Sequence, residues 1–256
     1  MLEKYLRDQR KQKDILLMTH IVVGYPSLEA SFEIVKAMVE AGVDLMELQI
    51  PFSEPIADGP VILKANQEAL ATGISVDECI KFGGRVAMEF DIPFLFMTYY
   101  NILFKYGTQR FVETAADKGL RGAIVPDLPP EEGQDYLAAM EAHRLAPIFI
   151  YAPTTTDDRM QLLARHASGF IYCVARKGVT GQQTTFSREL DGYLHRCRQA
   201  TDLPLALGFG VKDRADIEFL TGKADIAVIG TQTIRIVEDQ GVDAVGKFIA
   251  GLRMPK

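Results

Sequence analysis

Two carboxylates stand in one segment of the chain, in surroundings that favour chemistry. Glu47 lies near the end of an apolar run, residues 43–49, and Asp58 follows in a loop bounded by prolines. A carboxyl group shielded from water can both give and accept a proton near neutrality, whereas a more polar carboxylate can stay ionised and stabilise a forming cation. The spacing equally allows a structural interpretation, in which Glu47 is salt-bridged inside the protein and Asp58 caps the helix that starts at Pro60.

Glycine-rich turns after three late apolar runs are candidate anion sites. They are Gly178-Val179-Thr180-Gly181, Gly208-Phe209-Gly210 and Gly230-Thr231, and the last leads into a candidate short helix over residues 232–238. Glycines let backbone N–H groups approach an anion, and a helix N-terminus adds favourable partial charge. Glycines are also ordinary turn residues, but two such turns after adjacent late strands favour a phosphate site.

Other polar side chains have an open interpretation. Asp127 follows an apolar run in a stiff Pro-Asp-Leu-Pro-Pro loop, where it either staples the turn or takes part in chemistry. His20 lies between apolar neighbours and either faces a pocket or is a satisfied core histidine. The remaining histidines fall on expected helices and are expected at the surface: His143, His166 and His195.

Short apolar runs alternate with amphipathic segments along the whole chain. The runs lack polar alternation, which is typical of strands buried on both faces of a parallel sheet, and they span residues 15–23, 43–49, 93–99, 122–125, 147–151, 170–174, 203–207 and 225–229. Helical periodicity is clear over residues 28–39 and 242–252 and weaker over residues 131–143, 156–166 and 187–200. Thr156 and Ser187 are placed like N-caps.

This alternation predicts an α/β fold, a single (β/α)8 TIM barrel with extra helices, which forms one domain over residues 1–256. The extra helices are expected at residues 2–11 and 76–89. An open doubly wound sheet is the alternative, but the strand count reaches eight without a second block of composition. In a barrel the loops at the C-terminal ends of the strands carry function, so Glu47, Asp58 and the glycine turns would share one face.

Composition excludes several other classes. Lys and Arg number 28 against 34 Asp and Glu, a net charge of −6 without a long basic run, so no nucleic-acid role is expected. Cys79, Cys173 and Cys197 lack disulfide or metal-ligand spacing and are expected to be reduced thiols. The N-terminus lacks an apolar signal core and no apolar run is long enough for a bilayer, which predicts a cytoplasmic protein that binds no membrane.

The segment from Glu47 to Pro60 resembles the signature of the tryptophan synthase α chain family, E-L-G-x-P-F-S-D-P-x-A-D-G-P. Further motifs match in family order: Val22-Val23-Gly24-Tyr25-Pro26, Met97-Thr98-Tyr99-Tyr100-Asn101, Ile124-Val125-Pro126-Asp127-Leu128-Pro129, Arg176-Lys177-Gly178-Val179-Thr180-Gly181, Gly208-Phe209-Gly210 and Ile229-Gly230-Thr231. The resemblance implies a barrel enzyme that cleaves indole-3-glycerol phosphate to indole and glyceraldehyde 3-phosphate in tryptophan biosynthesis. It also implies no cofactor in this chain, and a β chain partner that holds pyridoxal phosphate in an α2β2 heterotetramer.

The same resemblance implies roles for individual residues. Glu47 matches the general acid/base, Asp58 the carboxylate beside the indole nitrogen, and Tyr172 a hydroxyl near the catalytic acid. The implied phosphate cradle consists of Gly181, Gly210, Gly230 and Thr231. The implied substrate contacts are His20, Gln49, Tyr99 and Thr180, and Pro51 and Glu54 are expected to face the β chain. No metal is required.

Four positions depart from the family pattern. Gln49 replaces a glycine, Glu54 an aspartate, His20 a larger apolar or aromatic residue, and Lys212 a serine. Because Gln49 and His20 could alter the pocket, a second hypothesis is a catalytically weak subunit that mainly binds and activates a β chain. A third is another phosphate-binding barrel enzyme, such as a sugar-phosphate lyase or isomerase, which the intact carboxylate pair disfavours. The polar segment 177–187 is predicted to be a lid that is mobile when the site is empty.

Overall fold

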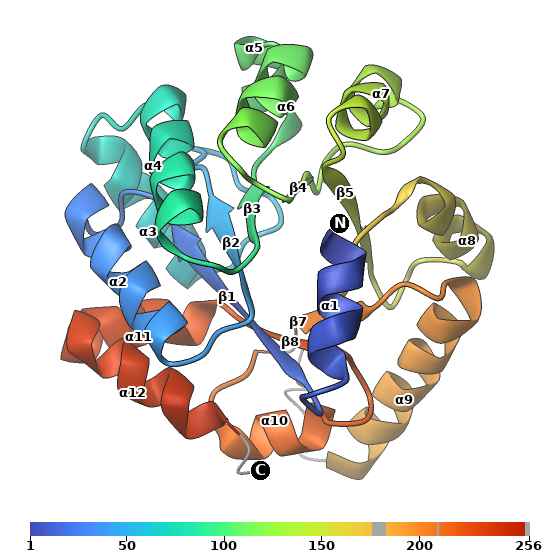
Figure 1. Cartoon of the computed structure of the whole chain (residues 1–256). Coiled ribbons are helices and arrows are strands. Elements are labelled where there is room, and N and C mark those ends of the chain that lie inside the picture. Colours follow the sequence, from blue (N-terminus) through green and yellow to red (C-terminus); the bar gives the residue numbers. More distant parts are fainter. Residues whose placement is uncertain (176–182, 209, 254–256) are drawn as a thin grey trace.

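Eight parallel strands close into a barrel in chain order (Figure 1). The strands are β1 (Leu16–Val22), β2 (Leu45–Gln49), β3 (Phe94–Met97), β4 (Gly122–Ile124), β5 (Ala146–Tyr151), β6 (Ile171–Val174), β7 (Leu205–Gly208) and β8 (Ile226–Ile229). Pairing of β1 with β8, from Leu16 opposite Ile226 onward, completes the ring. Every predicted apolar run overlaps a strand, so the closed barrel is confirmed over the open sheet. The computed structural model describes residues 1–175, 183–208 and 210–253, apart from the side chains of residues 183–187.

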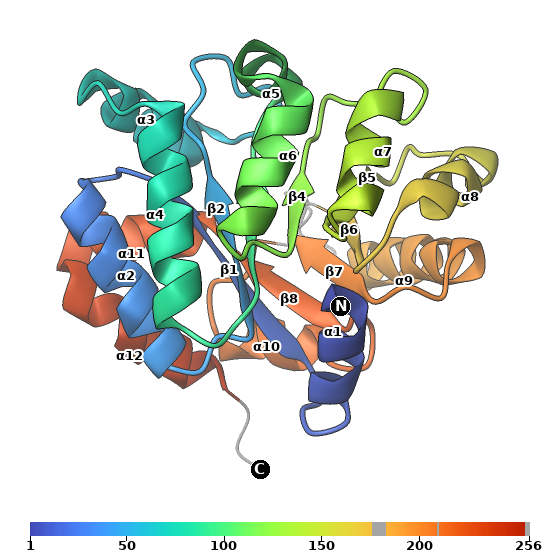
Figure 2. The same ribbon diagram turned by 45° about the horizontal axis from the view of Figure 1, so that its top comes forward.

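Helices surround the strands (Figure 1, Figure 2). They are α1 (Leu2–Arg10), α2 (Leu28–Glu40), α3 (Pro60–Ala71), α4 (Val76–Glu89), α5 (Tyr100–Tyr106), α6 (Thr108–Asp117), α7 (Gln134–Ala142), α8 (Asp157–His166), α9 (Gln183–Ala200), α10 (Arg214–Leu220), α11 (Thr231–Gln240) and α12 (Val242–Leu252). Both predicted extra helices are present, as α1 and α4. Leu2 and Leu6 of α1 pack among the residues that begin the strands, so α1 closes that end of the barrel.

Two of the predicted helix starts are wrong, and one predicted cap is confirmed. Thr156 caps α8, since its hydroxyl accepts a hydrogen bond from Arg159 N at 3.3 Å. Ser187 is not an N-cap, because α9 begins at Gln183 and no glycine or proline between them stops the helix. The helix predicted over residues 131–143 begins only at Gln134, after turns in which the amide groups of residues 132 and 133 donate to the carbonyls of Pro129 and Pro130.

Alternation along the strands divides the core into two layers. Leu17 and Ile21 of β1 face the helices, whereas Leu16 and Met18 lie in the barrel interior. The same period of two turns His20 inward above Met18. On β2 it turns Glu47 and Gln49 inward above Leu45, which belongs to the interior layer. The sequence therefore directs these polar side chains into the mouth of the barrel.

Three structural findings bear on the excluded classes. Within the described ranges, no helix is long and apolar enough to span a bilayer. The same part of the chain contains no group of three or more His, Cys, Asp or Glu that could hold a metal ion. The three cysteines are buried free thiols.

Candidate active site

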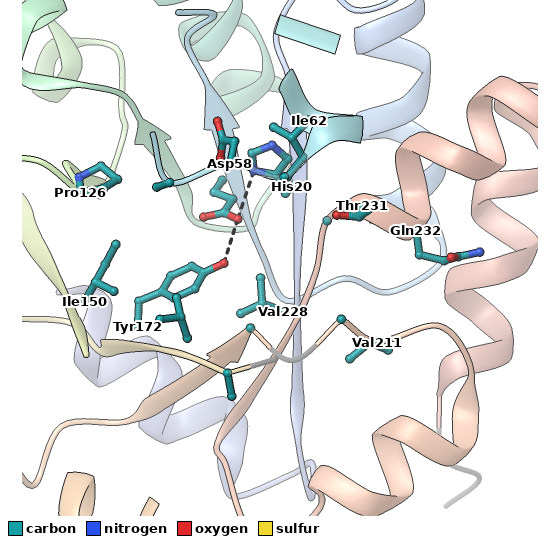
Figure 3. Close-up of a pocket in the computed structure, with 18 of the residues that line it drawn as sticks. His20, Asp58, Ile62, Pro126, Ile150, Tyr172, Val211, Val228, Thr231 and Gln232 are labelled. Carbon is teal, nitrogen blue, oxygen red and sulfur yellow. Dashed lines mark hydrogen bonds and ion pairs between the residues drawn. The ribbon is translucent and has the colours of Figure 1, made fainter. Parts of the chain in front are cut away.

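The C-terminal ends of the strands surround a cavity of about 1180 Å³ (Figure 3). Apolar side chains form part of its wall, including Ile62, Met97, Pro126, Ile150 and Val228. Polar groups come from opposite sides of the mouth: His20, Glu47, Asp58 and Tyr172, together with the turns at Gly210, Gly230 and Thr231. A concave apolar wall with a few convergent polar groups is the usual form of a small-molecule site.

Glu47 lies inside the barrel on β2, where two side chains approach the same carboxylate oxygen. Its Oε1 is 3.1 Å from His20 Nδ1 and accepts a hydrogen bond of 3.5 Å from the Tyr172 hydroxyl, as the dashed lines of Figure 3 mark. Burial, reinforced by the charges of Glu47 and Asp58, raises the pKa of Tyr172 well above its ordinary value. Tyr172 is therefore a neutral hydrogen-bond donor at physiological pH.

Asp58 lies in the loop between β2 and α3 and does not cap the helix, whose N-cap is Gly59 without a side-chain hydrogen bond. Its Oδ2 instead accepts a hydrogen bond of 2.6 Å from Gln49 Nε2. Burial raises the pKa of Asp58, although the hydrogen bond from Gln49 and the charge of His20 oppose the shift. The structural interpretation of Asp58 as a helix cap is thus wrong.

Gln49 and Tyr99 lie behind the site rather than in the cavity wall. Gln49 is fully buried, and its amide also approaches Asn66 Oδ1 at 3.4 Å. The Tyr99 hydroxyl accepts a hydrogen bond of 3.1 Å from Ala57 N, and its ring stacks on Phe52. Both residues, expected to touch substrate, position the loop that carries Asp58.

His20 is enclosed inside the mouth, beside Glu47. Burial alone would lower the pKa of His20, but the hydrogen bond and charge of Glu47 outweigh it, so the pKa is raised. The salt bridge that the structural interpretation expected for Glu47 is therefore made by a histidine. The interpretation of His20 as a satisfied core histidine holds only for Nδ1, because Nε2 is buried without a hydrogen-bond partner among the described residues.

The turns after β7 and β8 form the opposite end of the cavity. Gly210 has φ +84°, in the left-handed region that side chains rarely adopt. Gly230 is the N-cap of α11 and Thr231 its first residue, so the N-terminus of this helix opens onto the cavity (Figure 3). Such a terminus attracts anions.

Arg235 is a cavity residue that sequence reasoning missed. It lines the cavity together with Lys212, the residue that replaces the usual serine. Its signal was available in the spacing, because a side chain four residues after Thr231 lies on the same helix face. The positive charges of Arg235 and Lys212 lie at the end of the cavity where the glycine turns lie, and they strengthen the preference of that end for an anion.

Several expected site residues lie elsewhere. Thr180 and Gly181, with most of the predicted lid, fall outside the described residues, and the last part of the predicted lid belongs to α9 rather than to a loop. Pro51 is buried, whereas Glu54 is exposed on the loop after β2. Asp127 Oδ1 accepts a hydrogen bond of 2.8 Å from Tyr100 N and so fixes the start of α5, rather than the turn of its own loop as the structural interpretation expected.

Comparison with known proteins identifies the family of this barrel. The family described as Tryptophan synthase alpha chain matches residues 6–250. The tryptophan synthase alpha chain of Syntrophotalea carbinolica is 70% identical over 99% of this chain and 100% of its own length, and that of Desulforapulum autotrophicum is 66% identical over 98% and 100%. The aminoacrylate-bound crystal structure of tryptophan synthase from M. tuberculosis has a TM-score of 0.90 at 29% identity, covering 98% of this chain and 97% of its own. The chain belongs to the tryptophan synthase alpha chain family.

Proposed function

We propose that Glu47 and Asp58 carry out the cleavage of indole-3-glycerol phosphate to indole and glyceraldehyde 3-phosphate in the cavity at the barrel mouth. As a member of its family, the chain is a lyase of tryptophan biosynthesis and the α subunit of tryptophan synthase. The observation that carries the assignment of roles is the convergence of Glu47, Asp58 and Tyr172 on a cavity whose other end is built from glycine turns.

The first step is protonation of the indole ring by Glu47. Indole leaves poorly as a carbanion, but a proton added to ring carbon C3 gives an indolenine that can depart. Positive charge then forms at the ring nitrogen, where the carboxylate of Asp58 offsets it. The hydrogen bond from Gln49 supports this role because it favours the ionised form of Asp58.

The second step is removal of a proton from the glycerol hydroxyl next to the ring. Glu47 has just given up its proton and is the base within reach, so one carboxyl group serves both steps. Loss of the hydroxyl proton forms the aldehyde, the carbon–carbon bond breaks, and its electron pair returns to the indole ring. The Tyr172 hydroxyl donates to Glu47 Oε1 and so holds the carboxylate in place.

The two ends of the cavity suit the two ends of this substrate. The apolar wall at Ile62, Pro126 and Ile150 accommodates a flat ring. The phosphate lies at Gly210, Gly230 and Thr231, where backbone N–H groups and the N-terminus of α11 face it. On the basis of the sequence motif, we assign Thr180 to hold Asp58 and Gly181 to bind the phosphate together with the other glycines.

The partner is a tryptophan synthase β chain, which holds the pyridoxal phosphate of the complex. We infer an α2β2 heterotetramer in the cytoplasm, with residues 1–256 as one domain of each α chain and no cofactor bound by that chain. Glu54 and Ile56, which is 81% exposed, belong to the loop assigned to this contact, and Pro51 at the start of the loop is buried.

A catalytically weak subunit that mainly activates a β chain is the second candidate function, because His20 and Gln49 replace residues usual in the family. An indole-release assay on the purified chain, alone and with a β chain, separates the candidates. Release by the isolated chain, increased by the β chain, is the expected result. Absence of release under both conditions overturns the cleavage function, and activation of the β chain without any release supports the weak subunit.

A further inference from the structure

His20 and Glu47 form a buried acid–base pair inside the barrel. They are register partners on β1 and β2, their side chains meet at 3.1 Å, and these side chains are only 3% and 4% exposed. Among the described residues, His20 is the only basic side chain within ion-pair distance of Glu47. A buried carboxylate must be paired or protonated, so whether Glu47 carries a proton depends on His20.

Gln49 connects this pair to the second carboxylate. It lies two residues beyond Glu47, on the same side of β2, and its Nε2 donates to Asp58 Oδ2. That donation leaves its Oε1 buried without a partner among the described residues, and His20 Nε2 is in the same condition. The two atoms are complementary, because a protonated imidazole donates from both nitrogens and Gln49 Oε1 is an acceptor on the adjoining strand.

We propose that His20 and Glu47 hold one proton between them. In this arrangement His20 is a positioning residue that determines whether the catalytic carboxyl group carries a proton, and its role rests on the cleavage reaction proposed above. In the resting site the proton lies between His20 Nδ1 and Glu47 Oε1. The pair gives one proton to the indole carbon and regains one from the glycerol hydroxyl. It therefore ends each cleavage with the proton that it held at the start.

The surroundings of His20 favour retention of this proton. Burial lowers the pKa of His20, but the hydrogen bond and charge of Glu47, with smaller contributions from Asp58 and Gln49, raise it overall. Tyr172 faces Glu47 from β6 and stays neutral. Gly230, which follows β8, packs beside the His20 side chain, and the Thr233 hydroxyl of α11 lies 3.4 Å from the backbone carbonyl of His20; neither residue titrates.

The pH dependence of indole release tests the pair. His20→Asn keeps a hydrogen-bond donor near Glu47 but cannot ionise, and His20→Phe removes both properties. Because imidazole can hold the shared proton in the wild-type pair and only the buried carboxyl group can hold it in the variants, we expect the alkaline limb of kcat to move by about one pH unit or more in both variants. A wild-type profile in His20→Asn would show that only the hydrogen bond matters and would overturn the proposal.

Thr19→Val provides the matched control. Thr19 is the neighbour of His20 on β1, points to the other side of the strand, and has a buried hydroxyl without a hydrogen-bond partner among the described residues. Its replacement changes the same strand without touching the carboxylates. The pH profile of Thr19→Val should therefore match that of the wild-type protein, and a shift equal to that of the His20 variants would also count against the pair.

A measurement on the resting protein separates this inference from the reaction itself. Ring nitrogen-15 NMR of labelled protein follows the titration of each histidine, with His20 identified by the signal lost in His20→Asn. We expect His20 to titrate above about pH 6.5 and to titrate lower in Glu47→Gln, where burial is no longer outweighed. An unchanged midpoint in Glu47→Gln refutes the pair, whereas failure of the wild-type protein to release indole at any pH refutes only the cleavage function.

Discussion

Replacing Glu47 with glutamine removes a proton donor without removing its volume. The amide fills the same space beside His20 and Tyr172, whose polar atoms lie 3.1 and 3.5 Å from the carboxylate oxygen. It can still accept a hydrogen bond from Tyr172, but it can neither protonate the indole ring nor take the proton of the glycerol hydroxyl. The substitution therefore tests chemistry separately from shape.

The expected loss of rate follows from the double use of Glu47. A positioned acid or base contributes about 10²- to 10⁴-fold to a proton-transfer step, and both steps of the cleavage depend on this carboxyl group. We expect indole release to fall by at least about 10³-fold, which corresponds to roughly 4 kcal/mol in the activation free energy. Folding should be nearly unaffected, because His20 becomes neutral when its partner loses its charge. A change of about 1 kcal/mol would move Tm by only about 2–4 °C in a chain of this size.

Three measurements on Glu47→Gln together distinguish loss of proton transfer from loss of binding or of folding. Single-turnover indole release gives the chemical step, calorimetry with indole-propanol phosphate gives ligand binding, and thermal unfolding gives stability. The expected pattern is a large loss of release with analogue affinity and Tm close to those of the wild-type protein. Release within tenfold of wild type would remove Glu47 from the chemistry. Loss of analogue binding as large as the loss of release would mean that the cavity itself had collapsed.

Further substitutions test the remaining parts of the site. Asp58→Asn should lower kcat about 10²- to 10³-fold with the analogue still bound; a near-normal rate would show that stabilisation of the ring nitrogen was misassigned. Because the pKa of Asp58 is raised in the folded protein, its ionisation costs stability as pH rises above about 3.9, so Asp58→Asn should raise Tm at pH 7 and lose this gain in acid. Gly210→Ala, at φ +84°, should cost about 1–2 kcal/mol in a denaturant titration and weaken phosphate binding in calorimetry, and unchanged values would contradict its left-handed conformation. Arg235→Gln and Lys212→Ser should each raise KM by up to about fivefold at low salt and by less at high salt, because exposed ion pairs are weak and are screened by salt. If neither substitution changed KM, the phosphate would have to bind elsewhere.

Much of the architecture could be predicted from the sequence because it depends on local patterns. Apolar runs of strand length, separated by amphipathic segments, can bury their surface only as a parallel sheet covered by helices. Alternation within residues 43–49 places Glu47 and Gln49 on the same side of their strand, and the loop that follows brings Asp58 to the same end of the barrel. Helix boundaries were less predictable: neither Ser187 in α9 nor residues 131–133 before α7 carried a decisive start signal.

The relation of these side chains to one another was decided by the tertiary structure. Alternation shows which residues share a face of a strand. The stagger of neighbouring strands in the closed barrel determines that His20 lies opposite Glu47 rather than opposite Gln49. The same closure brings the Tyr172 hydroxyl from β6 to the carboxylate of β2 and leads α11 back so that Arg235 reaches the cavity. The contact between Tyr172 and Glu47 joins residues 125 positions apart, and no local pattern encodes it, because it arises only when the strands close into a ring.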